Sequence, residues 1–152
     1  MTERSVTHAT FCIERTYDAA PERVFAAFSD QAAKDRWFGG GDDWKRLERA
    51  FDFRVGGEER AVGQWASGVV TAFHAYYHDI VPNERVVFGY DMHLDGVRIS
   101  VSLTTVEIKP AGRGTRLVFT EQGAFLDGYD DAGAREHGTN GLLDALGRSL
   151  AD

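Results

Sequence analysis

The segment 131–150, DAGAREHGTNGLLDALGRSL, constrains the fold of this chain more than any other stretch. It carries the only long helical pattern after roughly a hundred residues whose patterns are those of strands. Leu142, Leu143, Leu146 and Leu150 fall on one helical face. Because a long antiparallel sheet needs a cover on one face, we predict that this late helix lies across a curved sheet.

Small residues accompany the leucines of this helix, namely Ala134, Gly138, Gly141 and Ala145. Each glycine costs about 1 kcal/mol of helix propensity relative to alanine, so some structural feature should compensate. Two interpretations fit equally well. The strip either allows tight packing of helix on sheet, or it forms one wall of a cavity.

The rest of the chain predicts the order strand, two short helices, then a run of strands. Residues 10–17 alternate as a half-buried strand does, with Phe11 and Ile13 on one side. Asp18 is a candidate cap and Pro21 a first residue for the next helix, and a second helix should span residues 30–37. Predicted strands then cover residues 47–55, 58–65, 69–81, 85–94, 97–109 and 113–123. We therefore expect one α+β domain with a curved antiparallel sheet of about seven strands.

Alternation along the late strands predicts which side chains face the helix. That face should carry Val86, Phe88, Tyr90 and Met92, then Val97, Ile99, Val101 and Leu103, then Leu117 and Phe119. Residues 124–130 should link the sheet to the helix. In that link, Phe125, Leu126 and Tyr129 could fold over one end of a cavity.

Composition excludes several classes of protein. Of the residues, 43% are hydrophobic and 27% charged, and the formal net charge of -7 argues against a nucleic-acid partner. No apolar run is long enough to span a bilayer, and the first residues lack the apolar core of a signal peptide, so we expect a cytoplasmic protein. Exposed sheet edges and net acidity permit a homodimer.

Common catalytic and metal-binding motifs are absent from the sequence, so we predict no cofactor and no metal site. There is no nucleotide-binding glycine loop and no His-Glu-x-x-His pair. The single Cys12 lies in a predicted strand near Glu14, and we expect a buried structural thiol rather than a nucleophile. Asp127, Asp130 and Asp131 precede the long helix, where a helix-capping role accounts for them better than a calcium site does.

The histidines give only weak support for a metal site. His74 and His78 share a strand face about 13 Å apart, too far to hold one metal together. His93 could approach one of them from a neighbouring strand, but no carboxylate is placed to complete a site. His137, on the long helix, could tip into the cavity or lie at the sheet edge.

Glu121 is the most informative single residue. Strict alternation from Leu117 and Phe119 points its carboxylate toward the covered face, where an unpaired charge is costly. Arg98, Arg116, Tyr76 or a histidine could then pair with it, and the group would be a candidate acid or base. A bulge near the strand end would instead turn Glu121 to solvent, and we favour that alternative.

Several short motifs resemble those of one family, in order and over nearly the whole chain. They are Ala19-Ala20-Pro21-Glu22-Arg23-Val24-Phe25, Trp37-Phe38, Phe53-Arg54-Val55-Gly56-Gly57 and Gly114-Thr115-Arg116-Leu117. Together they resemble the START-like (SRPBCC) superfamily with its helix-grip fold, and within it the activator of heat-shock-protein-90 ATPase homologue type. Many members carry Gly-Trp in the long helix, whereas here Thr139 follows Gly138. A missing indole would enlarge a cavity or alter its floor.

The resemblance implies an elongated apolar cavity between sheet and helix. We predict that it is lined by Phe53, Trp65, Tyr76, Phe88, Tyr90, Val101, Leu103, Phe119, Gly138, Leu142 and Leu146. The leading hypothesis is binding of a small hydrophobic or aromatic molecule, in one form as part of a stress response. A cyclase-like or hydrolase-like enzyme would use Glu121, His74 or Tyr76 as acid or base. The third hypothesis, a chaperone partner, is implied by the family name alone.

Overall fold

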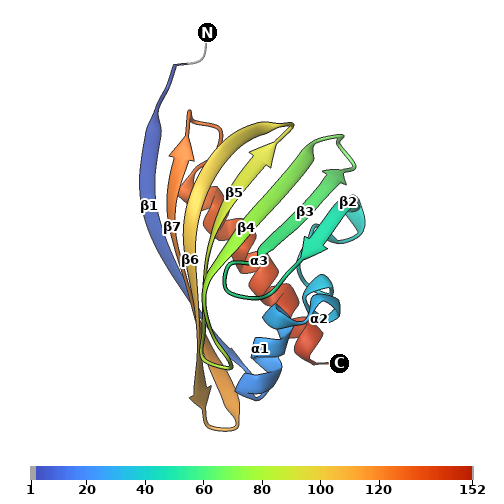
Figure 1. Ribbon diagram of the computed structural model, residues 1–152, viewed down its shortest axis with the longest axis vertical. Helices are drawn as coiled ribbons and strands as arrows, with labels where there is room; N and C mark the ends of the chain where they lie inside the picture. The colour runs from blue at the N-terminus through green and yellow to red at the C-terminus, as the bar shows by residue number, and fades with distance from the viewer. Residues whose placement is uncertain (1–2, 152) are drawn as a thin grey trace.

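A seven-stranded antiparallel sheet and three α-helices make up the part of the chain that the structure, a computed structural model, describes, residues 3–151 (Figure 1). The elements follow in the order β1 (Val6–Tyr17), α1 (Pro21–Ser29), α2 (Gln31–Asp35), the 3-10 turn η1 (Gly41–Asp43), β2 (Trp44–Phe51), β3 (Glu58–Trp65), β4 (Val70–Val81), β5 (Arg85–Leu94), β6 (Val97–Ala111), β7 (Gly114–Leu126) and α3 (Ala132–Leu150).

The sheet has the strand order β1-β7-β6-β5-β4-β3-β2, so β1 and β2 form its two edges. Strands β2 to β7 are a meander, and β1 adds antiparallel to the last of them. Helix α3 runs diagonally across the curved sheet, and α1 and α2 lie near its C-terminal end (Figure 1). This is the helix-grip architecture, and the predicted fold class is confirmed.

Helix starts follow local capping chemistry. The Asp131 carboxylate accepts a hydrogen bond from the Ala134 amide at 2.8 Å and begins α3, as expected for an N-cap. Pro21 opens α1, but the prediction that Asp18 caps this helix is wrong, because the cap position belongs to Ala20, whose side chain accepts no hydrogen bond. Asp30 caps α2, which ends at Asp35 rather than at Trp37.

One face of α3 is buried against the sheet, and β1 fixes its position. Leu143, Leu146 and Leu150 are buried on that face, while Leu142 beside them is only partly covered. The Tyr17 hydroxyl at the end of β1 donates a hydrogen bond to the Leu143 carbonyl at 2.8 Å. The ring of Tyr17 also lies against Gly147, where a Cβ atom would come within 3.1 Å of it.

Strand β6 contradicts the prediction that Val97, Val101 and Leu103 face the helix, because all three are about two-fifths exposed. Val97 begins the strand directly after the Asp95-Gly96 turn. Val101 and Leu103 lie on the outer face because of a bulge: His93 pairs with Arg98 and Met92 with Ser100, which leaves Ile99 as an extra residue. One extra residue reverses the alternation of everything that follows. The inward side chains of β6 are therefore Ser100, Ser102, Thr104, Val106 and Ile108.

Three further expectations are corrected. Cys12 is exposed on β1, on the opposite face from the buried Phe11 and Ile13, and is not a buried thiol. Strand β2 ends at Phe51, so Val55 lies in the following turn and is 57% exposed. Strand β7 runs on to Leu126 and takes in the first three residues of the predicted linker, and Phe125 is buried within it.

Candidate functional site

A cavity of about 370 Å³ lies between α3, α2 and the inward faces of the central strands. We call it the inner cavity. Aromatic side chains supply most of its wall: Phe28, Trp37, Phe38, Trp44, Trp65, Phe73, Phe88, Tyr90 and Phe119. Met92, Leu142 and Leu143 complete the apolar lining, and a smaller number of polar side chains interrupts it.

Helix α3 contributes small residues to this wall. A Cβ atom added at Gly138 or at Gly141 would have no neighbouring atom within 4 Å, so neither glycine serves close packing. Ala134 and Gly138 line the inner cavity. Of the two interpretations of the small-residue strip, the geometry supports the cavity wall.

A buried polar cluster lies where α3 begins. It consists of Tyr90, Ser100, Ser102, Glu121, Asp130 and Arg135, and we call it the Glu121 cluster. Glu121 is 1% exposed, so the favoured expectation that it turns to solvent is wrong. The reason is that β7 pairs with β6 without a bulge as far as Phe125. Its Oε2 atom accepts hydrogen bonds from Tyr90 at 2.7 Å, Ser102 at 2.8 Å and Arg135 at 3.2 Å.

Arg135 connects this cluster. Its guanidinium also donates to the Tyr90 hydroxyl at 2.8 Å, the Ser100 hydroxyl at 2.7 Å and the Asp130 carboxylate at 3.0 Å. Burial lowers the pKa of Arg135, but Tyr90, Glu121 and Asp130 outweigh this and raise it above its ordinary value. Burial and the neighbouring Glu121 raise the pKa of Tyr90, so its hydroxyl keeps its proton.

The second Glu121 oxygen, Oε1, accepts no hydrogen bond from residues 3–151. Within that range, the only buried side-chain polar atoms without a partner are Arg49 Nη2 and Thr104 Oγ1. Glu121 lines the inner cavity and is 1% exposed, so Oε1 belongs to a buried carboxylate at the cavity wall. It offers an acceptor to a molecule inside.

A second buried polar cluster, the Glu59 cluster, joins α2 to strands β2, β3 and β4. It consists of Lys34, Asp35, Arg49, Glu59 and Tyr77. Glu59 is completely buried and binds Lys34 Nζ at 2.6 Å and Arg49 Nη1 at 2.7 Å, and it also accepts the Tyr77 hydroxyl. Burial alone would raise the pKa of Glu59, but Lys34, Tyr77 and Arg49 outweigh it and hold the pKa below its ordinary value.

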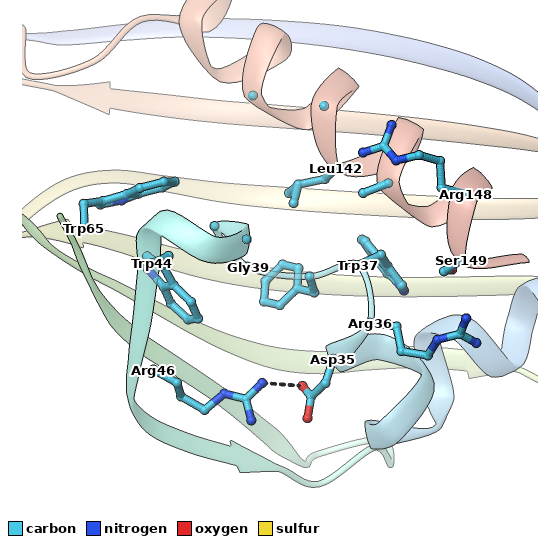
Figure 2. Close-up of a pocket in the computed structure, with 16 residues that line it drawn as sticks. Asp35, Arg36, Trp37, Gly39, Trp44, Arg46, Trp65, Leu142, Arg148 and Ser149 are labelled. Atoms are coloured by element: carbon cyan, nitrogen blue, oxygen red, sulfur yellow. Dashed lines mark ion pairs between the residues drawn. The ribbon is translucent and has the colours of Figure 1, made fainter. Parts of the chain in front are cut away.

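A more exposed cleft of about 740 Å³ adjoins the inner cavity (Figure 2). We call it the outer cleft. It shares with the inner cavity the side chains or backbone of Trp37, Phe38, Gly39, Gly40, Trp44, Trp65, Gly138 and Leu142. Arg36, Arg46, Arg148 and Ser149 belong to the outer cleft alone, together with Asp35, Gly41, Gly141 and Ala145.

Trp44 is held between the two spaces by close backbone approach. A Cβ atom at Gly63 would fall 1.9 Å from the Trp44 ring, and one at Gly40 would fall 2.3 Å from Trp44 Cβ. The indole Nε1 donates to the Thr71 hydroxyl at 3.1 Å. Both glycines are therefore required for this position of the indole, and all three tryptophans of the chain line the outer cleft.

The predicted cavity residues fall into three groups. Trp65, Phe88, Tyr90, Phe119, Gly138 and Leu142 line the inner cavity. Phe53 and Leu146 pack within the core instead, Phe53 against Phe25, Phe51 and Tyr77. Tyr76, Val101 and Leu103 lie on the outer face of the sheet, Tyr76 because β4 turns Phe73, Ala75 and Tyr77 inward.

The weak catalytic candidates are separated in the same way. His74 lies on the outer face with Tyr76, where it contacts the exposed Glu58 at 2.8 Å and the Tyr76 hydroxyl at 3.4 Å. Only Glu121 lines the inner cavity. Within residues 3–151, no three His, Cys, Asp or Glu side chains come together as metal ligands would, and no helix is long and apolar enough to cross a membrane.

Sequence reasoning missed Arg135, Lys34 and Trp44. Arg135 could have been found, because it lies four residues before Thr139 and eight before Leu143, on the buried face of the helix. Lys34 gave no such signal, since its partner Glu59 is distant in the sequence and joins it only through the fold.

Comparison with known proteins adds the family. The family described as Activator of Hsp90 ATPase homolog 1-like protein matches residues 18–151. A search of curated proteins finds no match. Among solved structures, the Mll3558 protein from Rhizobium loti is 51% identical over 96% of this chain and 99% of its own, with a TM-score of 0.89.

A putative uncharacterized protein from Rhizobium leguminosarum is 47% identical, with 99% of both chains covered and a TM-score of 0.94. The AHSA1-like protein from Aeromonas hydrophila shares the fold at 21% identity, with 94% of this chain and 92% of its own covered and a TM-score of 0.74. The resemblance inferred from sequence motifs is confirmed: the chain belongs to the family of Activator of Hsp90 ATPase homolog 1-like proteins.

Proposed function

We propose that this protein binds a small, mostly apolar molecule in the inner cavity. The observation that carries the proposal is the cavity itself, whose volume of about 370 Å³ lies within the range of roughly 300–1,000 Å³ typical of ligand pockets. An apolar, largely aromatic wall with a few polar groups is the usual composition of such a pocket. The family and its fold support ligand binding in general.

Binding would rest on burial of apolar surface, at about 25 cal/mol per Å² removed from water. Aromatic walls also offer edge-to-face contacts to a planar ligand, as they already do to one another between Phe38 and Phe73. The Oε1 atom of Glu121, which accepts no hydrogen bond from residues 3–151, would orient a hydroxyl or amine on the ligand. Ordered binding therefore needs no metal or covalent step.

Gly138 provides a test that does not threaten folding. Gly138→Leu places a side chain into open space on the cavity wall, and leucine is a better helix former than glycine. We expect the affinity for the uncharged fluorescent probe N-phenyl-1-naphthylamine to fall at least tenfold, while thermal unfolding shows equal or greater stability. His137→Leu is the matched control, because His137 is the exposed neighbour and lines neither space.

The proposal fails if the wild-type protein does not bind the probe, or if Gly138→Leu binds it as tightly as His137→Leu does. Native mass spectrometry of freshly purified protein gives an independent measure. A co-purifying small molecule that is present in wild type and reduced in Gly138→Leu supports the same site.

Acid–base catalysis is a second candidate function, favoured by the hydrogen bond of 2.7 Å between Tyr90 and Glu121 on the cavity wall. No histidine or cysteine of residues 3–151 lines the inner cavity, so Glu121 would be its main acid or base. A mass change of a bound molecule in wild type, absent in Glu121→Gln, would support an enzyme. An unchanged mass in both supports binding alone.

A further inference from the structure

The outer cleft differs in charge from the rest of the molecule. Three arginines, Arg36, Arg46 and Arg148, line it against one carboxylate, Asp35. The chain as a whole has a formal net charge of -7. Asp42 and Asp43 follow in the η1 turn but do not line the cleft. An acidic protein therefore places an excess of positive charge beside the entrance to an apolar cavity.

Arg148 is the available cation in this cleft. It makes no ion pair or side-chain hydrogen bond within residues 3–151, whereas Arg46 contacts Asp35 at 3.4 Å. Figure 2 shows the Arg148 side chain extending from α3 in the direction of Leu142. The last helical turn suits a basic residue in any case, but that role does not require the guanidinium to lie over the cleft.

The cations of the inner cavity are already committed. Lys34 binds Glu59 at 2.6 Å, and Arg135 binds Glu121 and Asp130 at 3.2 and 3.0 Å. An anionic group placed inside would compete with these buried carboxylates and lose its own hydration. An anionic group in the outer cleft would remain partly hydrated and meet the Arg148 guanidinium, which has no side-chain partner among residues 3–151.

The two spaces are continuous along one wall. Trp37, Trp44, Trp65 and Leu142 line both, so one elongated molecule can contact both at once. Tryptophan and arginine are also the residues most often responsible for binding energy at interfaces.

We propose that the ligand is an amphiphilic anion, with an apolar body in the inner cavity and a carboxylate or phosphate group in the outer cleft against Arg148. This inference rests on the proposed binding function and specifies the chemical class of the ligand. Arg46 contributes less to binding of the anion, because its guanidinium already contacts Asp35. The cleft arginines exclude amphiphilic cations and prefer anions over neutral molecules of equal length.

Quenching of intrinsic tryptophan fluorescence measures the affinity for each probe, because all three tryptophans line the outer cleft. The probes are decanoate, decyl phosphate and 1-decanol, which share the alkyl chain. We expect the wild-type protein to bind at least one anion about tenfold more tightly than the alcohol, as one charge-assisted contact implies. Comparing the two anions distinguishes a carboxylate ligand from a phosphate ligand.

Arg148→Met should lower the affinity for the anion to the level of the affinity for 1-decanol. The affinity for 1-decanol itself should not change. Arg113→Met, at the exposed β6–β7 turn, is the matched control and should keep the preference. Raising the salt concentration should weaken binding of the anion more than that of the alcohol. Equal affinity for anion and alcohol in wild type, or an Arg148→Met variant that keeps the preference, overturns the inference while binding stands. If no probe binds, the proposed function fails with it.

Discussion

The molecule buries two charged clusters on the same side of its sheet, and they differ in what surrounds them. In the Glu59 cluster, both carboxylate oxygens are engaged, and α2, β2, β3 and β4 enclose the group. In the Glu121 cluster, three donors meet at one oxygen, and the other oxygen accepts no hydrogen bond from residues 3–151 although the residue lines the inner cavity. The first cluster has the geometry of a structural joint. The second has an unused acceptor, which is what a ligand requires.

The largest expected effect is on Glu59. Glu59→Gln leaves Lys34 and Arg49 buried beside a neutral group, and breaking a buried ion pair in this way costs about 3–5 kcal/mol. We expect the midpoint of urea unfolding to fall accordingly, with little change in probe affinity of the folded fraction. A loss under 1 kcal/mol would contradict the structural role of this cluster.

Acid should reproduce part of that loss in the wild-type protein. The pKa of Glu59 is lower in the folded state than its ordinary value of 4.5, so its ionised form stabilises folding above pH 4.5. That contribution is lost as the pH falls through the lower, folded pKa. Between pH 6 and pH 3, the free energy of unfolding should therefore decrease more steeply with falling pH for wild type than for Glu59→Gln. Parallel curves would show that Glu59 is not the group responsible.

Glu121→Gln should lower the free energy of unfolding less than Glu59→Gln does, and it should weaken ligand binding more. Arg135 keeps its contacts to Asp130 and Ser100, so we expect a loss of about 1–3 kcal/mol. Because the side chain at the cavity wall loses its negative charge, a cavity ligand with a hydroxyl or amine should bind more weakly. Isothermal titration measures this affinity. Equal effects of Glu59→Gln and Glu121→Gln on binding would remove the distinction between the clusters.

The smallest effects come from one matched pair of tyrosines. Tyr77→Phe and Tyr90→Phe each remove one hydroxyl from a buried carboxylate, at a cost of about 1 kcal/mol. Tyr90 lines the inner cavity and Tyr77 does not. Thermal unfolding should show similar losses, whereas probe displacement should change in Tyr90→Phe alone.

The sequence was sufficient for the architecture, because periodicity and turn residues are local properties. The order of the elements, the Asp131 cap and the burial of Leu143, Leu146 and Leu150 on α3 all agree with the sequence patterns. Strand β6 was misread at Ile99, since a single extra residue in a bulge leaves no trace in composition and reverses every later side chain. Ser100 and Ser102 face inward for that reason.

The site was less predictable than the fold, since its polar groups pair with residues that are far away in the sequence. Lys34 and Arg135 are charged residue types that are seldom buried without partners, and those partners come from other elements. Glu121 was identified as a candidate because alternation is local. Whether it met a cation depended on where α3 crosses the sheet, which only the fold determines.

The most direct test of the central claim is a methyl NMR titration of the wild-type protein with decanoate. Met92 and Leu142 line the inner cavity, whereas Val101 and Leu103 are exposed on the outer face of the same sheet. The account predicts saturable shifts of the Met92 and Leu142 methyl signals and unchanged Val101 and Leu103 signals. Shifts confined to Val101 and Leu103, or no saturable shift at Met92 and Leu142, would contradict it.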